Sequence, residues 1–513
     1  MAEAEPDRPA SPKLIRGLGP IDATMIVMGS MIGSGIFITS AESARLVGSP
    51  GWLLVAWAIA GALTVAGALC AAEVAAMMPR AGGQYVFLRE AYGPATGFLF
   101  GWATFLVVQT GTIAAVAVAF AKFLGVLAPA VSATNFLIRP IELGGSGYAL
   151  GLSTQQLVAV ALIALLTALN TRGLRTGKAI QNTFTFTKTA ALIALIVVGV
   201  CFGANRGGAA WTSSWWSPSA NGWTAAGAQK DLGAVGTLAF VLLLGKAMIG
   251  PLFSQTAWNS VTFTGGEIRE PGRTLPRALV FGCGTVVGLY LLANVAYLVT
   301  LPFDQIQGAD QDRVGTALMK AVLGPIGVTV MAVAIMISTF GCINGLVLSG
   351  ARVLYAMARD GLFFRKVATT NAHHVPAVAL IAQGAWAVFL TLPVKVTVDH
   401  ETHAVSYGNT YNQLLQFLTP VDLTFYMLMV GSVAMLRRKA PRAERPYRTF
   451  AYPLPMLFYL TVAGLLVADF IYLEPTTAGI GYAIALAGIP VYWLRSLATR
   501  GRRPAAGAVG DGD

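Results

Sequence analysis

Glycine and serine interrupt the first long apolar stretch of the chain, in the run GSMIGSGIF at positions 29–37. Glycine costs a helix about 1 kcal/mol relative to alanine and opens the left-handed region of backbone space, so a helix can unwind here. The amides of Gly33, Ser34 and Gly35 would then be free to bind an anion such as a carboxylate. Gly29 and Gly33 also form a GxxxG pair that would let two continuous helices pack closely. This segment alone leaves both interpretations open.

A second apolar stretch, LLLGKAMIGPLFSQTAWNSVTF at 242–263, carries Pro251 followed by polar residues. Proline removes one helix hydrogen bond and collides with the carbonyl group four residues earlier, so we expect this helix to break near Phe253 to Thr256. Carbonyl groups freed at the two breaks would bind an ammonium group. We assign that role to Met31, Phe253, Ser254 and Thr256. Amides and carbonyls together match the two ends of a zwitterion.

The composition indicates which solvent surrounds these stretches. Charged residues make up 11% of the 513 residues and hydrophobic residues 55%, with a mean hydropathy of +0.65, whereas soluble proteins have about 25% charged residues. A soluble enzyme is therefore excluded, and apolar runs of about 20 residues have the length of bilayer-spanning helices rather than of barrel strands. The cysteines fall inside these runs without metal-ligand spacing, and no HExxH motif occurs. We expect no disulfide, metal, cofactor or nucleic-acid partner.

We predict an all-α polytopic membrane protein with twelve transmembrane helices. The predicted spans are 21–47, 52–78, 94–126, 154–171, 182–203, 234–266, 275–301, 325–357, 376–394, 409–436, 451–473 and 477–498. Lysine and arginine concentrate in the N-terminal segment, in alternate connections and in the C-terminal segment, so the positive-inside rule places both termini in the cytoplasm. The segment 1–20 lacks the apolar core of a signal peptide, and we expect it to be retained as a short cytoplasmic segment.

The spans divide into two halves of five, 21–203 and 234–436, followed by two extra helices in 451–498. An odd number of spans per half gives the halves opposite orientations. Paired interruptions in their first spans, helices 1 and 6, are typical of a transport site at the middle of the bilayer. The remaining segments are an external Trp-rich connection at 204–233, a basic cytoplasmic loop at 437–450 and a disordered tail at 499–513.

Two lysines lie inside spans, where a charge near the membrane centre costs about 2.5 to 3.5 kcal/mol. Lys188 ends the run FTFTK. Its ammonium group would take the place of a coupling cation and brace span 1 against span 5, or its side chain would extend to the membrane edge. Lys246 would face an outer vestibule or pair with a carboxylate. Glu73, near the inner end of span 2, is expected to pair with a basic cytoplasmic residue.

Two surface clusters have competing interpretations. The tryptophans of the external connection would either anchor it at the membrane interface or form a lid over the protein. They are Trp211, Trp215, Trp216 and Trp223. The basic cluster that begins at Arg437 and ends at Arg448 would either set the topology or bind anionic lipids specifically.

Several of these motifs together resemble the amino acid-polyamine-organocation superfamily, most closely its L-type amino acid transporter group and the related bacterial exchangers. The matching pieces are GSMIGSGIF (29–37), PRAGGQYVFLREAYGP (79–94), FTxxK ending at Lys188, FSQTAWNSVTFTGGEIREPGRTLPRA (253–278), FGCINGLVLSGARVLYAMARDG (340–361), VPAVAL (375–380) and RPYRTFAYP (445–453). They cover nearly the whole chain in the expected order, which makes the combination specific.

The resemblance implies a twelve-helix fold with a five-plus-five inverted repeat, in which helices 1 and 6 are broken, that moves amino acids by alternating access. It implies that Gly33, Ser34 and Gly35 bind the substrate carboxylate and that Phe253 is the external gate. Lys188 would replace the sodium ion of related symporters. Cys342 and Asn344 would lie where the eighth helix approaches the side-chain pocket.

Two departures from this group limit the inference. Thr256 stands where large-neutral transporters have glycine, which shrinks the pocket and weakens the case for a bulky aromatic substrate. The segment 127–153 has no cysteine, so we expect no disulfide-linked heavy chain. We expect a monomer or homodimer.

We expect a transporter of neutral L-amino acids in the plasma membrane, or in the inner membrane of a bacterium, working by sodium-independent exchange or facilitated transport. Proton-coupled symport, and exchange of cationic amino acids or polyamines, are the alternatives.

Overall fold

The structure is a computed structural model of the whole chain. It describes residues 17–80, 82–143, 148–172, 177–203, 214–229, 232, 236–371, 375–398, 405–407 and 410–500. The expected cytoplasmic segment at the N-terminus up to residue 16, Trp211 and the expected disordered tail from residue 501 lie outside the described residues.

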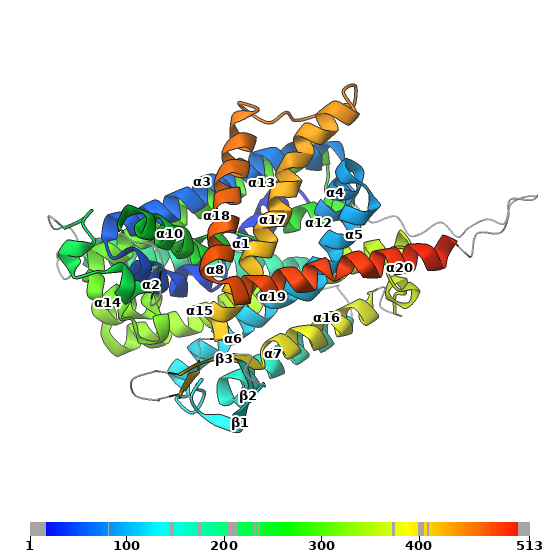
Figure 1. The fold of residues 1–513 in the computed structure, drawn as a ribbon. Coiled ribbons are helices and arrows are strands. Elements are labelled where there is room, and N and C mark those ends of the chain that lie inside the picture. Colours follow the sequence, from blue (N-terminus) through cyan, green and yellow to red (C-terminus); the bar gives the residue numbers. More distant parts are fainter. Residues whose placement is uncertain are drawn as a thin grey trace, which may run out of the picture.

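Long apolar helices form most of the molecule (Figure 1). Ten helical segments in the described part of the chain are long and apolar enough to cross a membrane, and the bent pair α1–α2 makes eleven. The helices are α1 Pro20–Met31, α2 Gly35–Val47, α3 Pro50–Met77, α4 Gln84–Tyr92, α5 Pro94–Ala103, α6 Gln109–Leu127, α7 Thr154–Thr171, α8 Gly177–Gly203, α9 Ala225–Ala228, α10 Gly236–Ala247, α11 Ile249–Ser254, α12 Ser260–Phe263, α13 Pro271–Thr300, α14 Phe303–Gln307, α15 Val314–Arg359, α16 Ala377–Leu390, α17 Thr410–Lys439, α18 Leu454–Leu473, α19 Pro475–Leu486 and α20 Gly488–Arg500.

The remaining predicted span, 376–394, is a helix of only 14 residues, α16. It ends at Leu390 because the chain then enters a strand, β3 (Pro393–Val398). The described helices therefore support ten or eleven spans by length and composition. The twelfth, α16, falls short of the usual bilayer length.

A small antiparallel sheet corrects the all-α prediction. The strands are β1 Phe136–Glu142, β2 Tyr148–Ser153, β3 and β4 Val405–Tyr407, in the order β1-β2-β3-β4. Its central register pairs Tyr148 with Lys395 and Ala149 with Val394. The sheet therefore joins two connections that are far apart in sequence, and reading each connection separately misses such long-range pairing.

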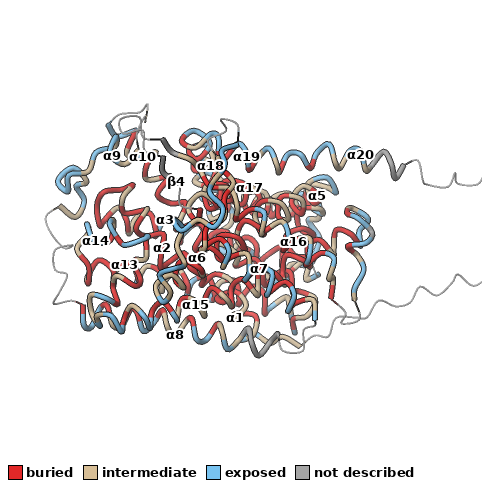
Figure 2. The backbone as a smooth tube through the Cα atoms, turned by 90° about the horizontal axis from the view of Figure 1, so that it is seen from below, coloured by how far each residue is buried: buried red, intermediate tan, exposed pale blue. Residues whose placement is uncertain are grey.

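Helices distant in sequence are neighbours in the bundle. α3 packs along α13, α6 and α8 pack along α15, and α17 packs along α18, the last two visible in gold and orange in Figure 1. Figure 2 shows that buried residues concentrate inside the bundle, with α20 along its edge beside α5. Large apolar side chains such as Phe186, Phe281 and Leu465 are exposed on the spans, as expected for surfaces that face lipid.

The described tryptophans of the external connection pack over the turn between α2 and α3. The Gly51 amide donates to the Trp215 carbonyl at 3.0 Å, and the Trp223 indole donates to the Arg45 carbonyl at 3.1 Å. Gly48, at the turn, has a φ of +67°, and a Cβ there would lie 2.3 Å from the Trp223 ring. The described tryptophans therefore hold this connection against the turn between α2 and α3.

Candidate functional site

The first predicted interruption is a break. α1 ends at Met31, α2 begins at Gly35, and the two axes are bent by 42°. Ile32 has extended backbone angles, φ −74° and ψ 93°. Of the two interpretations left open by the sequence, the structure therefore shows unwinding rather than one continuous helix with a GxxxG packing face.

Side chains of other helices satisfy carbonyl groups freed at this break. The Tyr290 hydroxyl on α13 donates to the Met31 carbonyl at 2.9 Å, and the Ser338 hydroxyl on α15 donates to the Ile32 carbonyl at 3.4 Å. The three residues between α1 and α2 are buried. A carbonyl oxygen has two lone pairs, so the Met31 carbonyl can still accept a second hydrogen bond.

The second break begins slightly later than predicted. α11 continues through Ser254, and helix resumes as α12 at Ser260. Ala257 lies between them with a left-handed φ of +67°, and its amide donates to the Tyr426 hydroxyl at 3.3 Å. The Thr256 hydroxyl and amide both donate to the Phe253 carbonyl, at 2.8 and 3.2 Å, so that carbonyl already accepts two hydrogen bonds.

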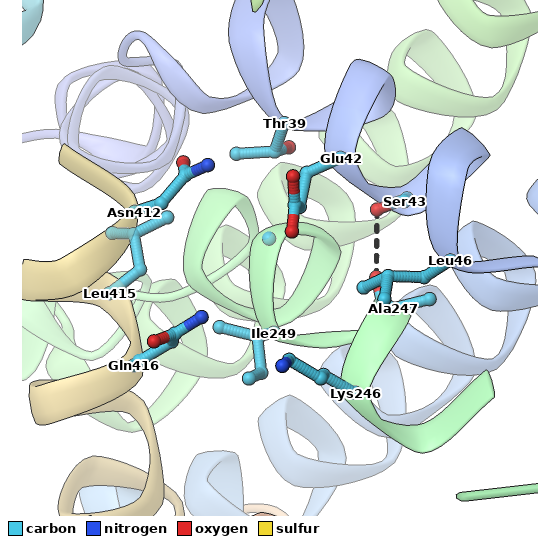
Figure 3. A pocket seen from close by; sticks show the side chains of 11 residues that line it. Thr39, Glu42, Ser43, Leu46, Lys246, Ala247, Ile249, Asn412, Leu415 and Gln416 are labelled. Atoms are coloured by element: carbon cyan, nitrogen blue, oxygen red, sulfur yellow. Dashed lines mark hydrogen bonds between the residues drawn. The ribbon is translucent and has the colours of Figure 1, made fainter. Parts of the chain in front are cut away.

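Pro251 acts at the other end of α11. Because proline has no amide hydrogen, the carbonyl of Ala247, four residues earlier, receives no helix hydrogen bond from it. The Ser43 hydroxyl on α2 donates to that carbonyl at 2.7 Å (Figure 3). α10 ends at this residue, Ala247, and helix resumes as α11 at Ile249. The proline therefore accompanies a short interruption at which the two segments are in contact.

The two interrupted segments touch at Gly35 and Ser254. A Cβ at Gly35 would lie 2.1 Å from the Ser254 hydroxyl oxygen and 3.0 Å from its Cα. One turn further along α2, Thr39 lies 3.4 Å from the same hydroxyl, and a Cβ at Gly250 would lie 2.4 Å from the Thr39 Cβ. Only glycine permits this approach, which brings the predicted carboxylate site and the predicted ammonium site together.

An aromatic pair closes one side of the first break. The Ser34 hydroxyl lies 3.2 Å from the Tyr411 hydroxyl on α17. The Tyr411 ring meets the Phe253 ring edge to face, with centroids 6.1 Å apart, and the Lys122 ammonium lies 6.0 Å from the Tyr411 ring centroid. Phe253, the predicted gate, is therefore packed directly against the site, and Tyr411 is a contact that the sequence analysis missed.

Lys188 joins α8 to α1 immediately before the first break. Its ammonium group donates to the Gly29 carbonyl, and the side chain is only 1% exposed. The charge therefore lies inside the bundle, which excludes the alternative of a side chain extending to the membrane edge.

The two residues predicted to approach the side-chain pocket, Cys342 and Asn344, contact different parts of the structure. The Cys342 thiol lies 3.8 Å from the Ser30 carbonyl, and a Cβ at Gly33 would lie 3.4 Å from its sulfur. Asn344 instead accepts a hydrogen bond from the Asn170 side chain on α7 at 2.9 Å. Cys342 therefore faces the first break, and Asn344 pairs with α7.

A small pocket lies beside Thr39 and Gly250, between α2, the α10–α11 segment and α17 (Figure 3). Glu42 and Lys246 lie on its wall. The Lys246 ammonium also binds Glu474 at 2.6 Å, so the predicted pairing with a carboxylate is confirmed, and the outer vestibule stays a prediction. Burial raises the pKa of Glu474, but Lys246 and Lys395 together hold it below its usual range.

A buried carboxylate, Glu73, lies near the C-terminal end of α3 and binds residues of the segment that follows α17. Arg437 binds both oxygens of Glu73, at 2.9 and 2.8 Å, and the Thr449 amide and hydroxyl each donate to it at 2.8 Å. Arg445 lies 3.4 Å away. The predicted pairing of Glu73 is confirmed, and two arginines of the basic cluster are occupied by this carboxylate.

Comparisons with known proteins find relatives that match nearly the whole chain. The large neutral amino acids transporter small subunit 2 of Rattus norvegicus is 29% identical over 484 residues, 94% of this chain and 81% of the relative. The Asc-type amino acid transporter 1 of Mus musculus is 27% identical over 490 residues, 94% of this chain and 81% of the relative. The serine/threonine exchanger SteT of Bacillus subtilis is 27% identical over 483 residues, 94% of this chain and 97% of the relative.

A family profile described as amino acid permease matches residues 18–494, which include both breaks, Lys188 and the aromatic pair. The chain belongs to this family, the amino acid permeases, and is a membrane transporter of amino acids rather than an enzyme.

Proposed function

We propose that the protein exchanges neutral L-amino acids across the plasma membrane by alternating access, without sodium. The observation that carries this proposal is the contact between the two interrupted helices at Gly35 and Ser254. The names of the three relatives, which specify large neutral amino acids, Asc-type transport and serine/threonine exchange, support the substrate class. The proposal includes twelve spans in two inverted halves, with both termini in the cytoplasm.

The substrate carboxylate would bind the amides at the start of α2. Gly33, Ser34 and Gly35 lie where that helix begins, and the N-terminus of a helix favours an anion because its first amides lack helix partners. The substrate ammonium would bind carbonyl oxygens of the two breaks, including that of Met31. Phe253 would cover the bound substrate, supported by its edge-to-face contact with Tyr411.

Lys188 would supply a fixed positive charge in place of a transported ion. Its contact with the Gly29 carbonyl ties α8 to α1 at the last turn before the break. A related symporter would need a cation to make such a link, and release of that cation would couple transport to its gradient. A covalently attached ammonium cannot leave, so transport would not be coupled to a gradient of that cation, as in exchange or facilitated transport.

Counterflow into liposomes tests this function. Purified protein is reconstituted with or without internal unlabelled norleucine, and uptake of labelled norleucine is measured with and without external sodium and with and without a pH gradient. We expect uptake only when internal amino acid is present, and no effect of sodium. Uptake that needs a pH gradient but no internal amino acid would establish proton-coupled symport instead.

A further inference from the structure

The carbonyl groups assigned to the substrate ammonium are not equally available. The Phe253 carbonyl already accepts two hydrogen bonds from Thr256, and the Met31 carbonyl accepts one from a tyrosine. Within the described part of the chain, no donor is bonded to the carbonyl of Thr256 itself. Thr256 follows by two residues Ser254, which touches Gly35 where the interrupted segments meet. Its carbonyl therefore has both lone pairs open to a ligand at the second break.

The Tyr426 hydroxyl on α17 fixes the direction in which this carbonyl points. The Ala257 amide donates to that hydroxyl at 3.3 Å, and the Ala257 N–H and the Thr256 C=O belong to one peptide group. That group is trans and planar, so its C=O and N–H point in opposite directions. Because the N–H is directed at Tyr426, the Thr256 carbonyl is directed away from it. The left-handed backbone of Ala257 is costly for a residue other than glycine, so the peptide group would turn more freely without this hydrogen bond.

A chain of buried hydrogen bonds sets the orientation of the tyrosine hydroxyl. Tyr426 donates to the Asn259 side-chain oxygen at 3.1 Å, and the Asn259 nitrogen donates to the Gln84 side-chain oxygen at 2.6 Å. The Gln84 nitrogen donates to the Phe425 carbonyl at 3.1 Å. Backbone groups form both ends of the chain, since the Phe425 carbonyl can only accept and the Ala257 amide can only donate. One orientation of each side chain between them therefore satisfies every bond.

A glycine brings Gln84 to the second break. Gly83, immediately before α4, has a φ of +47°, and a Cβ there would lie 2.3 Å from the Thr262 hydroxyl oxygen and 2.9 Å from the backbone carbonyl carbon of that residue. Only glycine permits this approach. The connection between α3 and α4 is therefore packed against α12, the helix that follows the break.

These contacts give Tyr426 a role that the sequence does not indicate. We propose that Tyr426 is a positioning residue for the substrate ammonium group: it aims the Thr256 carbonyl at that group, while Asn259 and Gln84 hold its hydroxyl in place. The tyrosine acts through the backbone, so loss of its hydroxyl should weaken ligands that carry an ammonium group and spare ligands that lack one. The inference rests on the proposed function, because it requires a bound zwitterion, and deepens it.

Norleucine and hexanoate provide the test because they differ by the ammonium group. Each competes with a trace of labelled norleucine in counterflow, and both half-inhibitory concentrations are measured in wild type and in Tyr426→Phe. We expect the variant to raise the norleucine value roughly 2- to 12-fold, as for the loss of one hydrogen bond, and to leave the hexanoate value unchanged.

Tyr482→Phe is the matched control. The Tyr482 hydroxyl on α19 lies 2.7 Å from the Thr424 hydroxyl and donates to the Pro420 carbonyl at 3.0 Å. This variant also loses hydrogen bonds between a tyrosine and its neighbours, but neither neighbour belongs to a helix break. Both half-inhibitory concentrations should stay at the wild-type values.

Gln84→Met tests the chain of hydrogen bonds. Alone it should raise the norleucine value and spare hexanoate, and it should add little to Tyr426→Phe, because both changes release the same peptide group. Equal weakening of norleucine and hexanoate in Tyr426→Phe overturns the proposal, since it shows a structural role only, and so does an unchanged norleucine value. Effects of the two changes that multiply overturn the role of Gln84.

Two further outcomes are distinguishable from these. If Tyr426→Phe does not fold, the ratio of the two half-inhibitory concentrations in Gln84→Met decides alone, and an unchanged ratio there overturns the proposal. If wild-type protein does not exchange norleucine, or if hexanoate competes with it as strongly as norleucine does, the proposed function fails and the inference fails with it.

Discussion

Replacing Gly35 with alanine should separate the two interrupted helices. The added Cβ would lie 2.1 Å from the Ser254 hydroxyl oxygen, 2.7 Å from its Cβ and 3.0 Å from its Cα. Rotation of the serine hydroxyl cannot relieve the contacts with Cα and Cβ. Carbon atoms pack best about 3.5 to 4.0 Å apart, so α11 must move away from α2 by roughly 0.5 to 1 Å.

The strain should appear as lost substrate affinity. Adding a methyl group to a packed interior costs about 1 to 3 kcal/mol. If the substrate bridges the two segments, the dissociation constant should rise roughly 5- to 150-fold. The assay is counterflow of norleucine over a range of concentrations, with thermal unfolding measured on the same preparation.

Gly284→Ala is the matched control. Gly284 lies in α13, and a Cβ there meets no atom within 4 Å. The change should leave affinity unaltered and stabilise the helix by up to about 1 kcal/mol. Wild-type affinity in Gly35→Ala would refute the argument that the substrate binds where α2 and α11 touch.

Three further changes test other parts of the structure. Lys188→Met should abolish most transport while the protein still inserts, because the apolar spans are intact and only the Gly29 carbonyl loses its donor; wild-type counterflow would remove this lysine from the mechanism. Glu73→Gln should lower the free energy of unfolding by about 1 to 3 kcal/mol, because Arg437 loses its buried carboxylate partner; unchanged denaturant unfolding would contradict this. The pKa of Glu474 is held below its usual range, so its ion pairs should stabilise the protein fully above about pH 4.3 and fail as pH falls through the lower folded-state pKa. Thermal unfolding of wild type should then drop more steeply at low pH than that of Glu474→Gln, and parallel curves would refute it.

Local chemistry made the first break predictable from sequence. The run from Gly33 to Gly35 marks the unwound segment to within a residue, because glycine and serine destabilise a helix wherever they occur. Pro251 marks the right segment but not the right residue. The second break depends on Ala257, whose left-handed backbone is supported by a tyrosine from another helix, and no local pattern indicates that contact.

Contacts between distant segments explain the remaining misses. Tyr411 lies on α17 without a motif around it, and its contacts with Ser34 and Phe253 depend on which helices pack beside α17. The shortening of α16 also has a distant cause, since the residues after Leu390 pair with a strand more than 200 positions earlier. Spans and breaks follow from hydrophobicity and backbone preference, whereas the wall of the pocket beside Thr39 and Gly250 follows from packing between distant helices.

The central claim is that both ends of a zwitterion are held at the two helix breaks, and the most direct test removes one end at a time. Counterflow of labelled norleucine is measured in competition with pentylamine, which lacks the carboxylate, and with hexanoate, which lacks the ammonium. We predict that unlabelled norleucine competes and that each analogue is at least tenfold weaker, because each loses one set of backbone contacts. Competition by either analogue as strong as that of norleucine would contradict the claim.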